Sequence, residues 1–114
     1  MGQNADLAKG GTPFASGAAA GSGVLTKKPT VVSAITVQSV TAQYILFWDA
    51  TAVPGAADTT AIEVIKVPAA DSKQITFPKG KVFAKGVAWA TSSTAPAYTA
   101  GGTDAHVSIT ADVK

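Results

Sequence analysis

From residue 30 onward the chain consists of short runs of β-branched and aromatic residues, separated by segments rich in Gly, Pro, Asp and Ser. The clearest run is 105–113, in which apolar and polar residues alternate strictly. A period of two places successive side chains on opposite faces of a strand. Several such runs with turn segments between them predict an all-β fold. We expect an antiparallel β-sandwich of six to seven short strands, either jelly-roll-like or immunoglobulin-like.

The run 43–48 differs from the others because it is apolar on both faces. It is too short for a buried helix, so it predicts a central strand that is covered on both sides, by the domain or by a neighbouring subunit. Further strands are expected at 31–40, 61–67, 73–77, 81–84 and 86–91, with a turn at 78–80 and long loops at 49–60 and 92–103. The core is expected to contain Ile35, Val37, Ile45, Phe47, Ile62, Val64, Ile75, Phe77, Val87, Trp89, Val107 and Ile109.

The N-terminal segment has a different composition, since residues 1–23 hold six of the eleven glycines. With few large apolar groups to bury, it predicts a flexible arm over residues 1–29, followed by a sandwich domain over residues 30–114. Small residues let a backbone lie close to a partner, so we expect the arm to bind another protein. Its candidate contact residues are Leu7, Phe14, Leu25, Lys27 and Lys28. Deleting residues 1–23 is expected to leave a folded domain that no longer attaches to its partner.

Charge is scarce along the whole chain. Charged residues make up 14% of the sequence, against about 25% in typical soluble domains, and such a surface suits packing against other protein. The net charge is +2, and all nine basic residues are lysines. The chain therefore has no guanidinium group that could make bidentate hydrogen bonds to phosphate or guanine. This argues against nucleic-acid binding. Lys79, Lys81 and Lys85 are more simply interpreted as residues that guard a strand edge.

The absence of cysteine excludes disulfides, thiolate metal sites and cysteine nucleophiles. The first residues lack the basic and apolar regions of a secretory signal, and no stretch approaches the roughly 18 apolar residues of a membrane span. We therefore expect a soluble protein that is made in the cytoplasm and does not bind a membrane.

Few side chains could support chemistry. His106 is the only histidine, which excludes multi-histidine metal sites, and a solvent-facing or interface position is favoured over a catalytic one. Asp49, Asp58, Asp71 and Asp104 could supply oxygen ligands to calcium, but loop aspartates more often cap their own turns. We expect no enzymatic activity and no cofactor.

The aromatic residues could form a platform for sugar binding, but most lie inside apolar runs and are expected in the core. Only Tyr98, in a polar loop, is a candidate for an exposed aromatic side chain.

Three stretches carry a resemblance to a known group of proteins: YILFWDATAVPG at 44–55, IEVIKVP at 62–68 and FPKGKVFAKGVAWATSST at 77–94. Together they resemble small β-sandwich virion proteins of tailed bacteriophages, of the capsid decoration, cement or head-fibre type. The resemblance covers roughly residues 31–113. It implies a particle-bound protein, on the capsid or on the tail, and it carries over no functional residues.

The expected function is that of a structural virion protein, a decoration or cement protein whose arm helps it to bind and stabilise an assembled capsid. Its partner would be the major capsid protein or another virion protein. It would be located in the virion as a homo-oligomer, a dimer or a trimer, because many weak contacts then add up to firm attachment. The alternative is a fibre, spike or tail-tip module whose loops at 49–60 and 92–103 bind a host glycan or protein.

Overall fold

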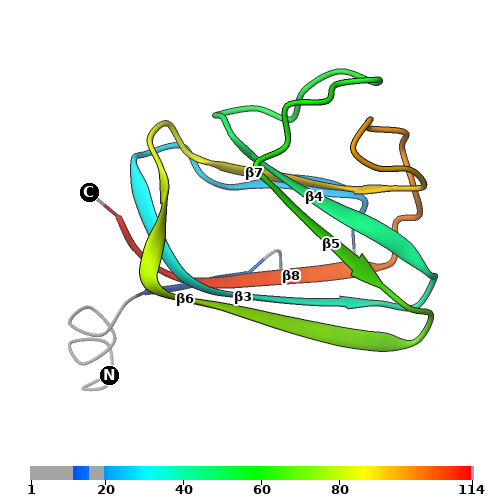
Figure 1. Cartoon of the computed structure of the whole chain (residues 1–114), viewed down its shortest axis with the longest axis horizontal. Coiled ribbons are helices and arrows are strands. Elements are labelled where there is room, and N and C mark those ends of the chain that lie inside the picture. Colours follow the sequence, from blue (N-terminus) through cyan, green and yellow to red (C-terminus); the bar gives the residue numbers. More distant parts are fainter. Residues whose placement is uncertain (1–11, 16–19, 114) are drawn as a thin grey trace.

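The computed structural model describes residues 12–15 and 20–113, and the described residues form eight strands and no helix. The strands are β1 (Thr12–Ala15), β2 (Ser22–Thr26), β3 (Thr30–Ser39), β4 (Gln43–Asp49), β5 (Glu63–Val67), β6 (Asp71–Phe83), β7 (Val87–Ser92) and β8 (Ala105–Val113). They make two four-stranded sheets packed face to face (Figure 1). The prediction of an all-β sandwich is confirmed.

The strand order identifies the kind of sandwich. Sheet A has the order β1-β8-β3-β6 and sheet B the order β2-β7-β4-β5. The first strand pairs with the last, the second with the seventh, the third with the sixth and the fourth with the fifth, all antiparallel. This is a long hairpin rolled up on itself, the topology of an eight-stranded jelly roll. Of the two predicted sandwich types, the structure has the jelly-roll type.

The sandwich begins earlier in the chain than the predicted boundary between residues 29 and 30. Strands β1 and β2 both lie in the segment expected to be a free arm, and they form one edge of each sheet. Small residues make this close pairing possible: a Cβ on Gly23 would lie 3.1 Å from Nε1 of Trp89. The backbone groups of β7 and β8 also need partners at this edge. Deleting residues 1–23 would therefore remove β1 and the start of β2, so the expectation that such a fragment folds needs correction.

The main core lies between the two sheets. The structure buries eight of the residues predicted for it, and Ile75 and Phe77 are partly buried against it. The buried members of the prediction are Ile35, Val37, Ile45, Phe47, Val87, Trp89, Val107 and Ile109.

The prediction for β5 is wrong by one residue in phase. Ile65 and Val67 face the core, with Ile65 opposite Ile45, while Ile62 and Val64 are 38% and 37% exposed. Both alternating sets of this run contain apolar residues, so periodicity alone could not choose between them. Glu63 belongs to the same alternating set as Ile65 and Val67. It lies at the edge of the sandwich, where Lys81 forms an ion pair with it at 3.5 Å.

Strand β6 is longer than expected and is not interrupted by the predicted turn at 78–80. Gly80 has a φ of 78°, which glycine adopts without steric cost. A Cβ at this position would also clash with the Val31 side chain. Pairing between β3 and β6 shifts register nearby, between Val32 and Ala34. The Pro-Lys-Gly sequence therefore forms an irregularity within one strand, where a turn was predicted.

A second apolar cluster lies on the outer face of sheet B. Leu46 and Trp48 of β4 are buried there with Ala88 and Ala90 of β7, and Tyr98 packs against them. The loop following β4 and the loop following β7 cover this cluster, and they bond to each other from Ala57 N to Tyr98 O at 2.7 Å. The prediction that run 43–48 is covered on both sides is confirmed, and its cover comes from the domain itself.

Candidate functional site

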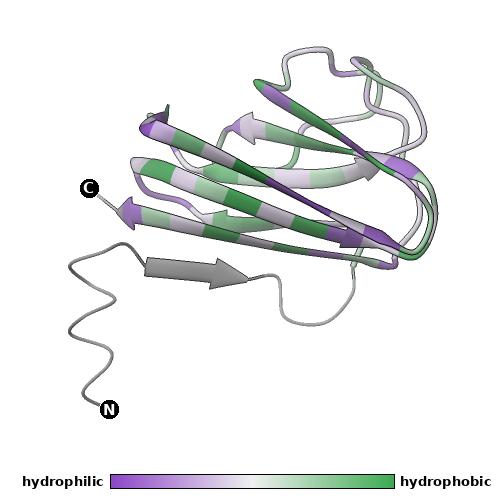
Figure 2. Ribbon diagram, turned by 60° about the horizontal axis from the view of Figure 1, so that its bottom comes forward, coloured by the Kyte–Doolittle hydropathy of each residue, from purple (hydrophilic) through white to green (hydrophobic). Residues whose placement is uncertain are grey.

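The outer face of sheet A is a regular polar surface that the strand pattern creates. Core residues alternate with outward residues along β3, β6 and β8, as the hydropathy bands in Figure 2 show. The outward residues pair across the strands, for example Gln38 with His106 and Thr36 with both Ser108 and Gln74. We call this surface the polar face; it comprises Thr36, Gln38, Ser72, Gln74, Thr76, His106, Ser108, Thr110 and Asp112. Hydroxyl and amide groups dominate it, and Asp112 is its one carboxylate.

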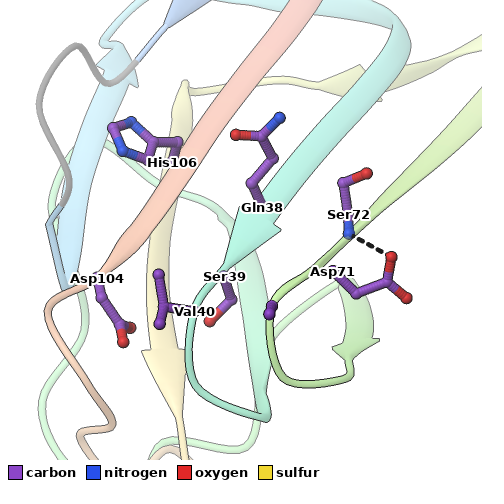
Figure 3. Close-up of a pocket in the computed structure, with 8 residues that line it drawn as sticks. Gln38, Ser39, Val40, Asp71, Ser72, Asp104 and His106 are labelled. Atoms are coloured by element: carbon purple, nitrogen blue, oxygen red, sulfur yellow. Dashed lines mark hydrogen bonds between the residues drawn. The ribbon is translucent and has the colours of Figure 1, made fainter.

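A hollow of about 320 Å³ lies at one end of the polar face. Three segments meet there: the end of β3, the start of β6 and the start of β8 (Figure 3). Its lining residues are Gln38, Ser39, Val40, Ala70, Asp71, Ser72, Asp104 and His106. Val40, which is 67% exposed, and Ala70 add apolar groups to this mostly polar lining. The hollow thus brings His106, Asp71 and Asp104 to one place, a grouping that the sequence did not indicate.

Hydrogen bonds occupy the carboxylates of the hollow. Asp104 accepts from the Thr41 hydroxyl at 2.5 Å and from Nε2 of Gln43 at 3.1 Å. The Thr41 bond holds the pKa of Asp104 below its ordinary value, although burial acts in the opposite direction. Asp71 accepts from the backbone N of Ser72 at 2.8 Å. Asp104 therefore ties the loop before β8 to Thr41 and Gln43, while Asp71 bonds to the backbone of its own neighbour, so both carboxylates have a structural use.

Gln43 makes the end of the sandwich rigid. Gln43 is buried. Its Nε2 donates to Ser39 Oγ at 2.8 Å, and its Oε1 accepts from Gly102 N at 2.7 Å. A Cβ on Gly101 would lie 2.6 Å from its Oε1, so glycine is needed for this approach. The turn after β3 and the loop before β8 are consequently locked together behind the hollow.

Of the other two aspartates, Asp49 bonds to the turn before β7 and Asp58 to its own turn. Asp49 accepts from the backbone N of Lys85 at 2.7 Å. Burial raises the pKa of Asp49, but the backbone hydrogen bonds from Lys85, Ala84 and Gly86, together with the charge of Lys85, hold it below its ordinary value. Asp58 accepts from the Thr60 hydroxyl at 2.6 Å and from Thr60 N at 2.7 Å, which forms the predicted capping turn. It also accepts from Trp48 Nε1 at 2.9 Å.

Replacing Asp58 with Asn should make the protein less sensitive to acid. The Thr60 hydroxyl, the Thr60 amide and Trp48 all hold the pKa of Asp58 below its ordinary value of 3.8. A carboxylate with a lowered pKa in the folded state stabilises above that ordinary value, and its contribution is lost as the pH falls through the folded pKa. We expect a lower urea midpoint for D58N at pH 7 and a smaller further decrease at pH 3 than in the parent. Asp112→Asn, on an exposed residue, is the control, and equal decreases in D58N and the parent would contradict the assignment.

The remaining candidates are distributed over the surface. His106 is exposed on the polar face, in line with the predicted solvent-facing or interface position. Among the described residues, no three His, Cys, Asp or Glu side chains are placed to hold a metal ion. In the same part of the chain, no helix is long and apolar enough to cross a membrane.

The candidate contact residues of the arm have different surroundings. Leu7 lies outside the described residues. Phe14 is the register partner of Ile109, which faces the core. Leu25 packs against the core of its own chain, so its side chain stabilises the domain, while Lys27 and Lys28 are exposed.

Two further expectations concern lysines and aromatic residues. Lys79 and Lys81 lie on β6, an edge strand of sheet A, and Lys85 follows it, which fits the edge-guarding interpretation. Tyr98 is half-buried with its ring edge-on to Trp48, at 5.3 Å between centroids. The ring that was the best candidate for stacking on a sugar thus packs within its own domain.

Comparisons with known proteins identify no relative: no family model, curated protein or solved structure matches this chain.

Proposed function

We propose that this chain is a structural virion protein that binds and stabilises an assembled bacteriophage capsid as a decoration or cement protein. The observation that carries the proposal is the polar face of sheet A, a regular surface of short hydroxyl and amide side chains with a single carboxylate. Interface centres are depleted of charged residues, because desolvating a charge is costly while hydroxyls and amides can exchange water for a partner's groups. Such a face can pack against a large protein surface that carries little charge.

Two further features support a capsid setting. Jelly-roll sandwiches recur in viral capsid domains, although they also occur in lectins and cupins, so the fold alone decides nothing. The resemblance of residues 31–113 to small virion proteins of tailed phages adds the specific context. A homo-oligomer attached at many equivalent places would gain avidity from weak individual contacts.

The test is to place charge on the polar face. Gln38→Lys with Thr76→Lys puts two lysines on exposed positions of neighbouring strands that are not register partners. Exposed substitutions of this kind usually change stability by less than about 0.5 kcal/mol. We expect the double variant to keep its circular dichroism spectrum and to lose co-sedimentation with particles that lack the protein.

The matched control is Thr51→Lys with Thr59→Lys, two exposed threonines in the loop after β4. This variant has the same added charge and should co-sediment like the parent. If the polar-face variant also co-sediments like the parent, the polar face is not the attachment surface.

The alternative is recognition of a host glycan by a fibre, spike or tail-tip module. The hollow beside His106 and Asp104 favours it, because its volume is near the lower limit of small-ligand sites and its lining combines polar groups with the apolar Val40 and Ala70. Binding of the purified protein to a glycan array, lost on Gln38→Lys, would support this function. A negative array together with co-sedimentation would support the capsid function.

A further inference from the structure

The edge strands of both sheets carry features that discourage pairing with another chain. Strand β6 has three lysines, Pro78 and the irregularity at Gly80. Strand β5 is short and contains Lys66, and β2 has a register shift between Val24 and Thr26. Lysine, proline, short length and bulges are the usual means by which natural sheets protect their edges.

Strand β8 carries none of these features. Its nine residues, 105–113, include no Lys, Pro or Gly, and they alternate regularly. On one side it pairs with β3, and on the other side it is covered by β1 over residues 108–111 and by Ala20 at Ala105. Without β1, a long, regular strand would present unpaired backbone groups at an edge of sheet A. Strand β8 therefore depends on a strand from the N-terminal segment.

Strand β1 is a short strand at the edge of sheet A. It has four residues, and its one strand partner is β8. Pro13 within β1 has no N–H to donate to a further strand, which discourages pairing on the outer side of β1. Removing β1 from sheet A leaves the β8–β3 and β3–β6 pairings as they are.

The chain is anchored immediately after this segment. Ala20 and Ala105 exchange two backbone hydrogen bonds, at 2.9 and 3.2 Å, and Gly21 O accepts from Thr91 N at 2.8 Å. Five residue steps separate Ala15 from Ala20, and they can span roughly 17 Å when extended. Neighbouring strands lie only about 4.8 Å apart. The connection can thus cover about three strand spacings, enough to carry β1 to the same edge of a molecule whose sheet A lies alongside.

We propose that β1 exchanges between two copies of this chain, so that Thr12–Ala15 of each copy pairs with β8 of the other. The four residue pairs of β1 with β8 are the same in the closed and the exchanged forms, so the balance depends on the connection and on protein concentration. Reciprocal exchange closes after two copies, because each β8 edge is then covered. It supplies a homo-oligomer for the proposed function without depending on the identity of the particle.

The absence of cysteine gives a direct test. Ala15 and Ser108 are register partners, so the double variant Ala15→Cys with Ser108→Cys can form a disulfide between β1 and β8. The protein is unfolded, refolded over a range of concentrations, oxidised and run on a denaturing gel without reductant. Exchange predicts a covalent band of twice the monomer mass, whose share increases with the refolding concentration.

Thr36→Cys with Ser108→Cys is the matched control, because these partners lie on β3 and β8 and cannot exchange with β1. It should give a disulfide within the monomer at every concentration. If the Ala15–Ser108 variant also gives only monomeric disulfide, or none, β1 exchange is refuted. The test uses no particles, so its failure leaves the co-sedimentation test of the proposed function untouched.

Discussion

Trp89→Ala should lower the free energy of unfolding by about 3 to 5 kcal/mol, the range measured when a large aromatic side chain is removed from a core. Trp89 is fully buried between the sheets, where Val87 and Phe47 belong to the same cluster. Its removal leaves a cavity that the rigid strands of both sheets can fill only in part. Urea unfolding followed by circular dichroism measures the change as a lower midpoint at constant slope.

Two further variants make this result specific. The Nε1–H of Trp89 meets no acceptor among the described residues, and an unpaired buried donor costs about 1 to 3 kcal/mol. Trp89→Phe removes that donor while it keeps an aromatic ring, so its loss of stability should be much smaller than that of W89A. Val82→Ala, at a residue that is 65% exposed, should have almost no effect. A W89A midpoint equal to that of the parent would refute the position of Trp89 in the core.

Deleting residues 2–26 should abolish cooperative unfolding, whereas deleting residues 2–11 should preserve it. The longer deletion removes both β1 and β2, together with the partly buried Leu25. It exposes the backbone edges of β7 and β8, which would then pair readily between molecules. The shorter deletion leaves every described strand intact.

Circular dichroism melts and size-exclusion chromatography of the two fragments distinguish the outcomes. We expect aggregation or an unfolded spectrum for the longer deletion, and a folded species for the shorter one. If the shorter fragment then fails to co-sediment with particles, residues 2–11, which include Leu7, contribute to attachment. A longer fragment that melts cooperatively at the parent's temperature would contradict the role given to β1 and β2.

Most of the fold could be predicted from the sequence, because alternation and turn residues report directly on strands. The alternation of 105–113 fixed which residues of β8 face the core, and the two-sided apolar run 43–48 indicated a covered central strand. The same signal failed in β5, where Ile62, Val64, Ile65 and Val67 are apolar in both phases. Contact with Ile45 of the neighbouring strand decided the phase, and that is a tertiary effect.

The N-terminal strands were missed for a different reason. Residues 12–15 and 22–26 are short and contain Pro13 and Gly23, which have low strand propensity. Their pairing is determined by partners that lie far away in sequence, such as Trp89 and Ile109. The hollow could not be predicted either, because His106, Asp104 and Asp71 come together only when the ends of β3, β6 and β8 meet.

The jelly-roll topology also determines where a peptide or protein fused to this chain would lie. Because the first strand pairs with the last, Thr12 lies opposite Ala111, close to the end of β8. Both ends of the described chain therefore leave the sandwich from the same end of sheet A (Figure 1). A tag, reporter or displayed peptide added after the last residue would emerge next to the start of β1. Cargo inserted in the exposed tip of the loop after β4, near Gly55, would instead be carried on the side of sheet B and away from both termini.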